Sequence, residues 1–590
     1  MKKLFIFAAI LLASISCKQE PKENAKLSDL FDRYYEEKLS FFPLEATSQG
    51  DNRFNDQLPI DISTDFRNKI SGFYSKYLGE LDEIDPKTLS EEEQVYYNTL
   101  RFELNSQLEG LTFPTNLIPF NQFWGLPLTI AQLGSGASSQ PFKTTKDYED
   151  WLVRIDKFTV WADTAIANFN AGIKQQYVLP TSLIKKMIPQ MNDLANTSVE
   201  KSLFYGPINN FPADMDSLTK VTLTEKYKSA ITEKIIPTYK KLGSYLSNVY
   251  LKAGRASSGV GMLPKGPSFY AYSAYSWTTT TKKPDEIMQL GFGEVSRIKK
   301  EMEKVKEQVG FKGTLEEFFT SLKNDPKLMP YKEPEEILEA FRQIQKKIDP
   351  NLSKMFNLTP KTKFEIRRTE AFREASASAE YMQGSADGSR PGIFYIPIPD
   401  AKTFNVTSGM ESLFLHEAIP GHHYQISLQQ ENQKLPKFMR FGGYGAYAEG
   451  WALYCESLGK ELGLYTDPFQ YMGALGDEMH RAIRLVVDVG IHAKGWTREE
   501  ALKYMMENEA ISEQGATAEI ERYMALPGQA LSYKIGAIKI RELRNRYTKQ
   551  MGDKFNLAEF HDQILKNGCL PLSVLEETMD IWAGTKGTVQ

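Results

Sequence analysis

Apolar residues recur at intervals of three and four positions along much of the chain, with charged residues between them. This spacing places the apolar side chains on one face of an α-helix. It predicts helices at residues 27–39, 218–251, 284–309, 334–348 and 498–509. Pro284 and Pro334 each precede acidic residues, which is typical of a first helical turn. Pro237 predicts a kink within the second helix.

Segments with the pattern of a β-strand are few. The clearest is residues 392–399, Gly-Ile-Phe-Tyr-Ile-Pro-Ile-Pro. Its two prolines lack the N–H group that a central strand donates, so we expect an edge strand near Tyr395 to which an extended peptide can add. Residues 254–266 and 385–390 are rich in glycine or serine and predict loops. The fold class that follows is mainly α, with a small edge β-sheet.

Composition narrows the class of protein only slightly. The 590 residues are 41% hydrophobic, which is ordinary for a globular protein, and the length alone predicts more than one domain. Lysine and arginine number 71 against 75 acidic residues, for a net charge of −4. A chain without excess positive charge is not expected to have nucleic acid as its main partner.

The N-terminus has the pattern of an export signal. Two lysines precede an apolar run at residues 4–13, which is too short to span a membrane, and a short segment of small residues leads to Cys17. A cysteine at this place resembles the bacterial lipobox, in which the cysteine is lipidated. The resemblance implies an exported protein of the cell envelope, anchored to the outer membrane through lipid on Cys17. Secretion with cleavage nearby is the alternative.

A cluster of histidines carries the clearest chemical signal. Three of the six histidines lie within eight positions, as His416, His422 and His423, and Glu417 follows the first. A helix that offers histidine and glutamate, with a second histidine one turn later, can bind zinc and activate water. The usual spacing is broken here, because Pro420 stands where the second ligand belongs.

The helix must be deformed at Pro420 if the cluster is to bind a metal. On a regular helix His422 would point about 240° away from His416, and His423 would lie about 10 Å along the axis. A widened turn at Pro420-Gly421 would bring His422 beside His416. Ser408 and Glu411 form a capping-box pattern, which predicts that this helix begins near Gly409.

A catalytic zinc ion needs a third protein ligand from another part of the chain. Glu449 is the best candidate, in a helical segment that follows the helix-breaking pair Gly442-Gly443. It stands 27 residues after His422, which is long enough for a second helix to pack alongside the first. Glu456 shares its face one heptad later and is placed to orient a histidine. We expect one Zn²⁺ per chain.

Three segments then resemble the signatures of a bacterial family known as domain of unknown function 885. They are residues 416–423 (His-Glu-Ala-Ile-Pro-Gly-His-His), 449–454 (Glu-Gly-Trp-Ala-Leu-Tyr) and 527–534 (Pro-Gly-Gln-Ala-Leu-Ser-Tyr-Lys). That family is similar to gluzincin peptidases such as angiotensin-converting enzyme, in which two histidines and a glutamate hold zinc. The resemblance implies a zinc-metallopeptidase-like fold and a peptide substrate. In those enzymes the second histidine follows glycine, which favours His422, although His423 stays open.

The same resemblance implies catalytic roles for three residues. Glu417 would accept the proton of the attacking water and pass it to the leaving amine. A donor to the oxyanion is expected in the C-terminal region, where Tyr523 and Tyr533 stand. Either tyrosine is alternatively a residue of the core.

A polar stripe lies outside these signatures. His480, Arg484, Asp488 and His492 recur every four residues in an otherwise apolar stretch, and so share one helix face. One interpretation is a network that binds a substrate carboxylate or supports the site. The other is a solvated face or an internal ion network.

These observations predict a zinc metallopeptidase with the following organisation. Residues 1–17 form a lipoprotein signal peptide, 18–27 a tether, 28–390 a helical region that walls a cleft, and 391–590 the catalytic helices. The alternatives are a non-catalytic ligand-binding lipoprotein and a hydrolase of another amide. A binding protein has no need of the paired histidine and glutamate.

Overall fold

The computed structural model describes residues 24–370, 374, 378–385, 388, 390–407 and 409–586. The signal peptide, Cys17 and the tether up to residue 23 lie outside this part, as does Ser408 of the predicted capping box. The last residues assigned to the tether already belong to helix α1 (Ala25–Phe41), because the side chain of Asn24 caps its first turn. Among the described residues, no helix has both the length and the apolar character needed to cross a membrane.

Helices make up 69% of the structure and strands 3%, which confirms the mainly α class. Helices α13 (Pro284–Gln308), α15 (Pro334–Met355) and α21 (Arg498–Asn508) begin where the sequence predicts. The long helix over residues 217–253 contains two π-helical segments, Ile231–Ile235 and Leu246–Tyr250. The first lies just before Pro237, so the predicted kink takes the form of a widened turn.

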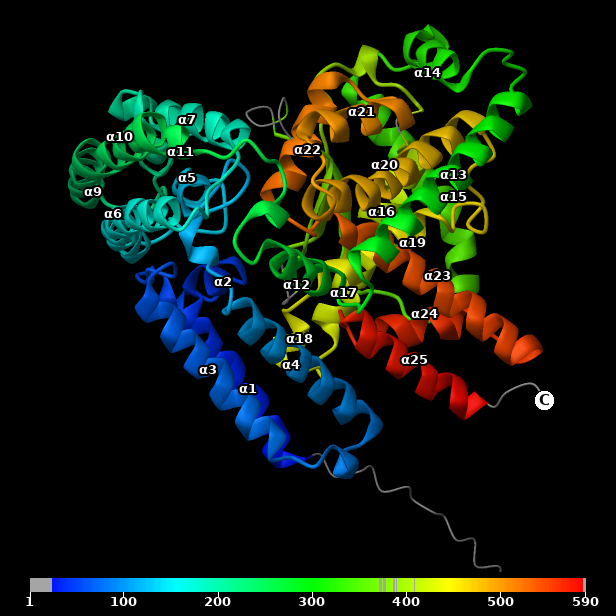
Figure 1. Cartoon of the computed structure of the whole chain (residues 1–590), viewed down its shortest axis with the longest axis horizontal. Coiled ribbons are helices and arrows are strands. Elements are labelled where there is room, and N and C mark those ends of the chain that lie inside the picture. Colours follow the sequence, from blue (N-terminus) through cyan, green and yellow to red (C-terminus); the bar gives the residue numbers. More distant parts are fainter. Residues whose placement is uncertain are drawn as a thin grey trace, which may run out of the picture.

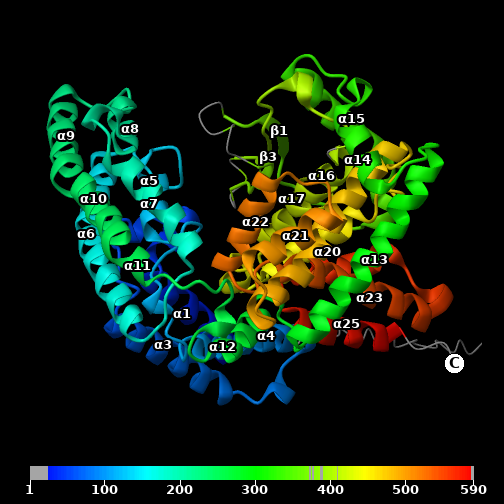
Figure 2. The same ribbon diagram turned by 45° about the horizontal axis from the view of Figure 1, so that its top comes forward.

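The helices form two lobes joined by a lower row (Figures 1 and 2). The lower row contains α1, α3 (Thr64–Asp82) and α4 (Glu91–Gly110). One lobe contains α5 (Leu126–Gly134), α6 (Thr145–Lys174), α7 (Thr181–Ala195), α9 (Ser217–Ala230) and α10 (Ile236–Tyr245). The other contains the C-terminal helices, of which α20 (Pro468–Ala493) and α23 (Leu531–Met551) are the longest. Helix α12 (Gly266–Thr278) lies between the lobes (Figure 1).

Two hydrophobic cores hold these helices together. The first includes Tyr34 and Trp451, and the second includes Phe158 and Ile520. Each core therefore draws residues from both sides of position 390, the boundary suggested by the sequence. Burial of this much apolar surface is the main force that fixes the two lobes.

The small sheet corrects one prediction. Strands β1 (Phe364–Arg368), β2 (Glu380–Met382) and β3 (Gly392–Ile396) have the order β1-β3-β2, so β3 is central rather than at an edge. It runs parallel to β1 and antiparallel to β2. The strand ends at Ile396, before both prolines, so neither interrupts its hydrogen bonds. An added peptide cannot pair with β3, because both of its sides are occupied.

The sheet packs against helix α16 (Met410–Glu417), as the sequence predicts for the helix of the histidine cluster. The Phe414 ring lies 6.3 Å from that of Phe364 on β1 and 6.5 Å from that of Phe394 on β3, between ring centroids. Helix α16 begins next to Gly409, where the sequence places its start. The carboxylate of Glu411 accepts the backbone N–H of Tyr465, so it is engaged with a distant loop.

Candidate metal centre

The helical conformation is interrupted between the two helices that carry His416 and His422. Helix α16 ends at Glu417, Ala418 leaves the helical conformation, the Ile419–Pro420 peptide is cis, and α17 (His422–Glu431) begins at His422. The deformation predicted at Pro420 is present. It is a complete break into two helices rather than a widened turn within one.

Close backbone contacts fix this break. A Cβ atom added at Gly421 would lie 1.9 Å from the backbone oxygen of His416, so only glycine fits where the chain folds back on α16. The carbonyl of Pro420 accepts a hydrogen bond of 2.9 Å from the indole Nε1 of Trp451. Trp451 belongs to α19 (Gly445–Glu456), so this bond ties the break to a third helix.

The same helix brings Glu449 to the two histidines. Its Oε2 atom lies 3.5 Å from Nε2 of His416 and 3.5 Å from Nε2 of His422. One ligand atom from each of the three residues lies within 4.8 Å of the others. Ligand atoms about 2.0–2.1 Å from a tetrahedral zinc ion are about 3.3 Å apart, so these distances suit a single ion.

His423 points to other partners. Its Nδ1 lies 3.0 Å from the Tyr381 hydroxyl and 3.3 Å from that of Ser427, and its ring packs against Phe364. Burial lowers the pKa of His423 to about 4, so the ring is neutral at pH 7. Of the two histidines that the sequence left open, the geometry therefore brings His422, and not His423, to His416.

Glu456 orients His416, as its position one heptad after Glu449 predicts. Its Oε1 atom accepts from Nδ1 of His416 at 2.7 Å, which leaves Nε2 directed at Glu449. Burial opposes ionisation of Glu449, but the hydrogen bonds and charges of His416 and His422 hold the pKa of Glu449 well below its usual value. Glu449 thus contacts both imidazoles and Glu456 contacts that of His416, and a donor set of two imidazoles and a carboxylate suits a divalent cation.

Two small residues set the distance between α19 and α23. A Cβ atom at Gly450 would lie 2.4 Å from Cα of Gly536, and one at Gly536 would lie 1.8 Å from the backbone oxygen of Ala446. The helices therefore cross in backbone contact directly beside Glu449. Tyr533 lies one turn before Gly536 on α23, so it stands near the same crossing.

The two predicted tyrosines differ in their surroundings. Tyr523 is 1% exposed; its hydroxyl donates to Glu519 at 2.5 Å and accepts from Nε of Arg484 at 2.9 Å. Tyr533 is half-buried, and within the described part of the chain its hydroxyl has no hydrogen-bond partner. Tyr533 is therefore the better placed of the two to donate to a substrate. Glu417 is buried, and its carboxylate is likewise without a hydrogen bond to any described residue.

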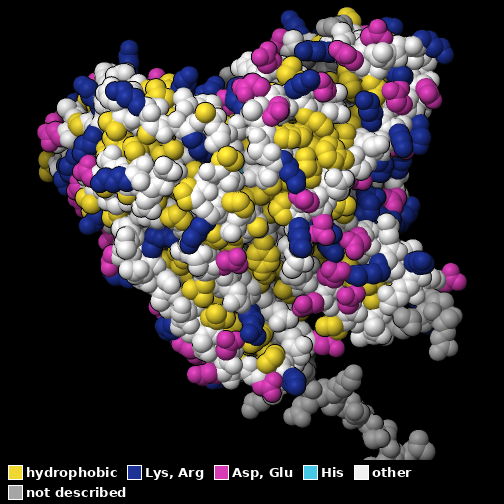
Figure 3. All heavy atoms as spheres, viewed as in Figure 1, with side chains coloured by type: hydrophobic (Ala, Val, Ile, Leu, Met, Phe, Trp, Pro, Cys, Tyr) yellow, Lys and Arg dark blue, Asp and Glu magenta, His cyan; other side chains and the backbone are white. Residues whose placement is uncertain are grey.

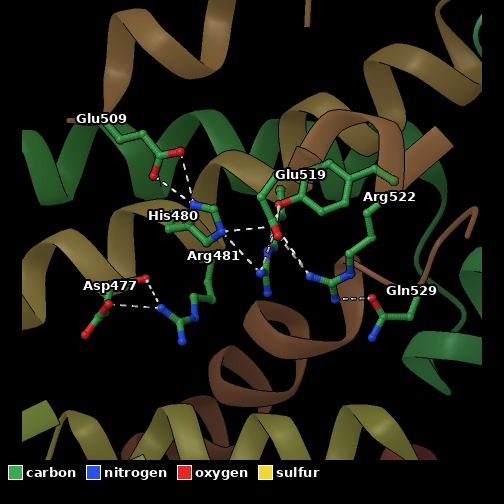
Figure 4. Close-up of polar contacts among 9 residues, drawn as sticks. Asp477, His480, Arg481, Glu509, Glu519, Arg522 and Gln529 are labelled. Atoms are coloured by element: carbon green, nitrogen blue, oxygen red, sulfur yellow. Dashed lines mark hydrogen bonds and ion pairs between the residues drawn. The ribbon is translucent and has the colours of Figure 1, made fainter. Parts of the chain in front are cut away.

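The polar stripe on α20 is an internal network, so the solvated-face interpretation is wrong. Arg484, Asp488 and His492 are all buried. His480 bridges Glu509 at 2.8 Å and Glu519 at 3.3 Å (Figure 4). Glu509 directly follows α21 and Glu519 lies on α22 (Glu513–Ala525), each more than 25 positions along the chain from His480, so no local pattern could reveal them.

Asp488 gives this network a pH dependence. It accepts the Tyr270 hydroxyl at 2.7 Å and the Gly528 N–H at 3.1 Å, but burial outweighs both bonds and raises the pKa of Asp488 to about 7. The unfolded value is about 3.9, so the stability from this group is complete below about pH 4 and is lost as the pH rises through 7. The unfolding free energy of the wild type minus that of Asp488→Asn is the quantity to follow. Between pH 4 and pH 8 this difference should fall by an amount on the order of 4 kcal/mol. Urea unfolding across this range measures the difference, and a pH-independent difference would refute the assignment.

Comparison with known proteins identifies one matching family and solved structures of similar fold. The family model described as "Bacterial protein of unknown function (DUF885)" matches residues 43–579. A solved structure described as "the putative lipoprotein from Colwellia psychrerythraea" has a TM-score of 0.87 and 29% identity, over 95% of this chain and 99% of that one. A "putative lipoprotein of unknown function from Shewanella oneidensis" has a TM-score of 0.75 at 18% identity, over 94% and 99%, and shows the fold alone. No curated protein matches the chain.

Proposed function

The chain belongs to the bacterial DUF885 family, and we propose that it is a zinc-dependent peptidase. The observation that carries the proposal is the meeting of His416, His422 and Glu449 from three helices, with Glu417 directly after His416 at the end of α16. Two histidines and a glutamate leave a fourth position open, as catalytic zinc sites do. A structural zinc site would instead be closed by a fourth protein ligand.

The residues fit the chemistry of amide hydrolysis. A zinc ion held there would polarise a carbonyl group and lower the pKa of a water molecule. Glu417 would take the proton of that water through its free carboxylate and return it to the leaving nitrogen. Glu456 would keep His416 in the tautomer that carries its proton on Nδ1. The Tyr533 hydroxyl would donate to the oxyanion that forms on the carbonyl.

Replacement of Tyr533 by phenylalanine tests the last role. The loss of one donor to an oxyanion is expected to lower kcat about 10²-fold with little change in KM. The zinc content should be unchanged, because Tyr533 is not among the three ligand residues. Tyr523→Phe is the matched variant, and a larger kcat loss there than in Tyr533→Phe would reverse the assignment.

The cellular location is proposed on two grounds. Cys17 stands where a lipobox cysteine stands, and both structural relatives are described as putative lipoproteins. We infer an envelope protein that is anchored to the outer membrane by lipid on Cys17. Mass spectrometry of the mature N-terminus would show the lipidated cysteine, whereas cleavage at another residue would contradict the anchor.

The alternatives make different demands on the site. A ligand-binding lipoprotein needs neither a free glutamate beside the histidines nor three converging metal ligands. A hydrolase of another amide would use the same catalytic groups. Only the identity of the substrate that is hydrolysed distinguishes such an enzyme from a peptidase.

The test is hydrolysis of a mixed peptide library, followed by mass spectrometry. The purified chain is expected to cleave peptide bonds, to lose this activity on chelation and to regain it with Zn²⁺. His422→Ala should be inactive. A chain that holds zinc and cleaves no peptide would refute the peptidase and favour another amide as substrate.

A further inference from the structure

A second site is indicated by a cavity of about 460 Å³ between the first turn of α4 and the second half of α25 (Leu572–Lys586). The two helices lie side by side in the lower part of the molecule (Figure 1). The volume falls in the range of about 300–1,000 Å³ that is usual for small-molecule sites. Asn432, which follows α17, also lines the cavity, whereas His422 stands at the first position of that ten-residue helix. At about 1.5 Å per residue, roughly 15 Å of helix separates the cavity from the metal centre.

Two buried polar side chains line this cavity without a hydrogen-bond partner. Asn567 is 6% exposed and Trp582 is 8% exposed, and among the described residues neither the side-chain amide of Asn567 nor the indole N–H of Trp582 is paired. Both groups keep surface that is accessible from the cavity, unlike the fully enclosed unpaired groups elsewhere in the described chain. Buried polar groups are normally paired, so a ligand with complementary groups is expected here.

The charges around the cavity cancel. Glu91 and Glu92 on α4 are matched by Lys434 and Lys566, from the segments that follow α17 and α24 (Leu557–Leu565). Figure 3 shows the same mixture over the lower part of the face in view, where basic and acidic side chains are interspersed, whereas hydrophobic side chains gather in the middle between the lobes. A site without an excess of one charge favours a neutral ligand over a phosphate or a carboxylate.

The other lining residues suit hydroxyl groups and a small apolar group. Nine of the twelve lining residues are polar or charged, which argues against an acyl chain as the ligand. The hydroxyls of Thr578 and Thr585 donate to carbonyls of their own helix, so each can still accept a hydrogen bond. The Asn567 amide offers both a donor and an acceptor, as a second amide requires, and Val95 and Ile581 are apolar. A neutral ligand with hydroxyl groups, an amide and a methyl group is an N-acetylated sugar.

The start of the described chain lies next to the cavity. The backbone N–H of Asn24 donates to Oε1 of Glu93 at 2.6 Å, in the first turn of α4. Cys17, the proposed site of the lipid, stands seven residues earlier, and seven residues span at most about 25 Å. The proposed anchor therefore keeps this end of the molecule near the envelope surface, where bacterial glycans carry N-acetylated sugars.

We propose that this cavity binds an N-acetylated sugar unit of an envelope glycan. The acetamido group pairs with the side-chain amide of Asn567, and the indole N–H of Trp582 donates to a ring hydroxyl. Val95 and Ile581 contact the methyl group, which is thereby removed from water. The site gives the protein a binding function that depends on neither the metal centre nor the proposed peptidase activity.

Titration calorimetry with neutral oligosaccharides tests the proposal. The purified chain is titrated with tri-N-acetylchitotriose, a trimer of N-acetylglucosamine, and with maltotriose, a trimer of glucose that has no acetamido group. The acetylated trimer is expected to bind at least about tenfold more tightly, because its acetamido group adds two hydrogen bonds to Asn567. The proposal is overturned if the acetylated trimer shows no saturable binding at millimolar concentration, or if the two sugars bind equally.

Two variants assign the binding to this cavity. Asn567→Ala should bring the affinity for the acetylated trimer to within about threefold of that for maltotriose, because it removes the amide that recognises the acetamido group. Trp582→Phe keeps an aromatic ring but removes the N–H donor, and should weaken the binding of both sugars about threefold or more. Asn105→Ala is the matched control and should bind as the wild type does, because Asn105 is exposed on α4 and donates to the Arg101 carbonyl of the same helix.

The His422→Ala variant separates this site from the metal centre. It should bind the acetylated trimer as tightly as the wild type does, because His422 stands at the opposite end of α17 from the cavity. A loss of sugar binding in His422→Ala would place the sugar at the metal centre and overturn the proposal. Unchanged affinity in both Asn567→Ala and Trp582→Phe would overturn it as well.

Discussion

Replacement of Glu417 by glutamine is expected to reduce peptide hydrolysis about 10³-fold or more, with zinc content unchanged. Glutamine keeps the size of the side chain but cannot accept the proton of the attacking water. Glu417 is not one of the three residues whose ligand atoms converge, so the metal should stay bound. The effect should lie in kcat, because the proton transfer occurs during the chemical step. Steady-state kinetics with metal analysis of the same sample measures both quantities.

Glu411→Gln is the control for this variant. Glu411 is also buried on α16, but its carboxylate accepts the Tyr465 N–H and takes no part in the cluster. Its glutamine variant should keep kcat within about a factor of three, because an amide oxygen still accepts that bond. Comparable losses of kcat in both variants would show that the effect of Glu417→Gln comes from the loss of a buried charge on α16 and not from the loss of a catalytic base. Full activity in Glu417→Gln would contradict the assignment of Glu417 as the general base.

The second large effect is expected from Gly421→Ala. The added methyl group would meet the backbone oxygens of His416 and Leu415 at 1.9 and 2.3 Å, and neither can move without displacing the ligand-bearing end of α16. We expect zinc affinity to fall at least about tenfold and the unfolding free energy to fall by about 1–3 kcal/mol, as for overpacked sites. Zinc titration and urea unfolding measure the two effects.

Gly293→Ala on α13 provides the contrast. A Cβ atom at Gly293 has no other atom within 4 Å, so alanine should be neutral or slightly stabilising in this helix. Normal zinc binding by Gly421→Ala would mean that the fold-back at residues 418–421 does not position His422.

Local patterns predicted the helices and the clustering of His416 with His422, because both depend on short-range spacing. Helical periodicity gave the starts of α13, α15 and α21. Pro420 and Gly421 indicated the place where the first histidine-bearing helix is interrupted. The helix-breaking pair Gly442-Gly443 indicated the start of α19. What the sequence could not give is the form of the break, because Trp451 fixes it from another helix.

Long-range pairing explains the remaining differences. The prolines after β3 indicated an edge strand, yet β1 and β2 approach from segments earlier in the chain and enclose it. The partners of the α20 stripe, Glu509 and Glu519, come from outside that helix. A single helix shows that its polar face needs partners but cannot show which residues supply them.

Zinc content is the most direct test of the central claim. Plasma mass spectrometry of the purified chain should find about one zinc per protein, and His422→Ala and Glu449→Ala should lose it. His423→Ala should retain it, because that ring bonds to Tyr381 and Ser427 instead. A wild-type chain that stays free of zinc on titration, or a loss of zinc in His423→Ala but not in His422→Ala, would contradict the proposed metal centre.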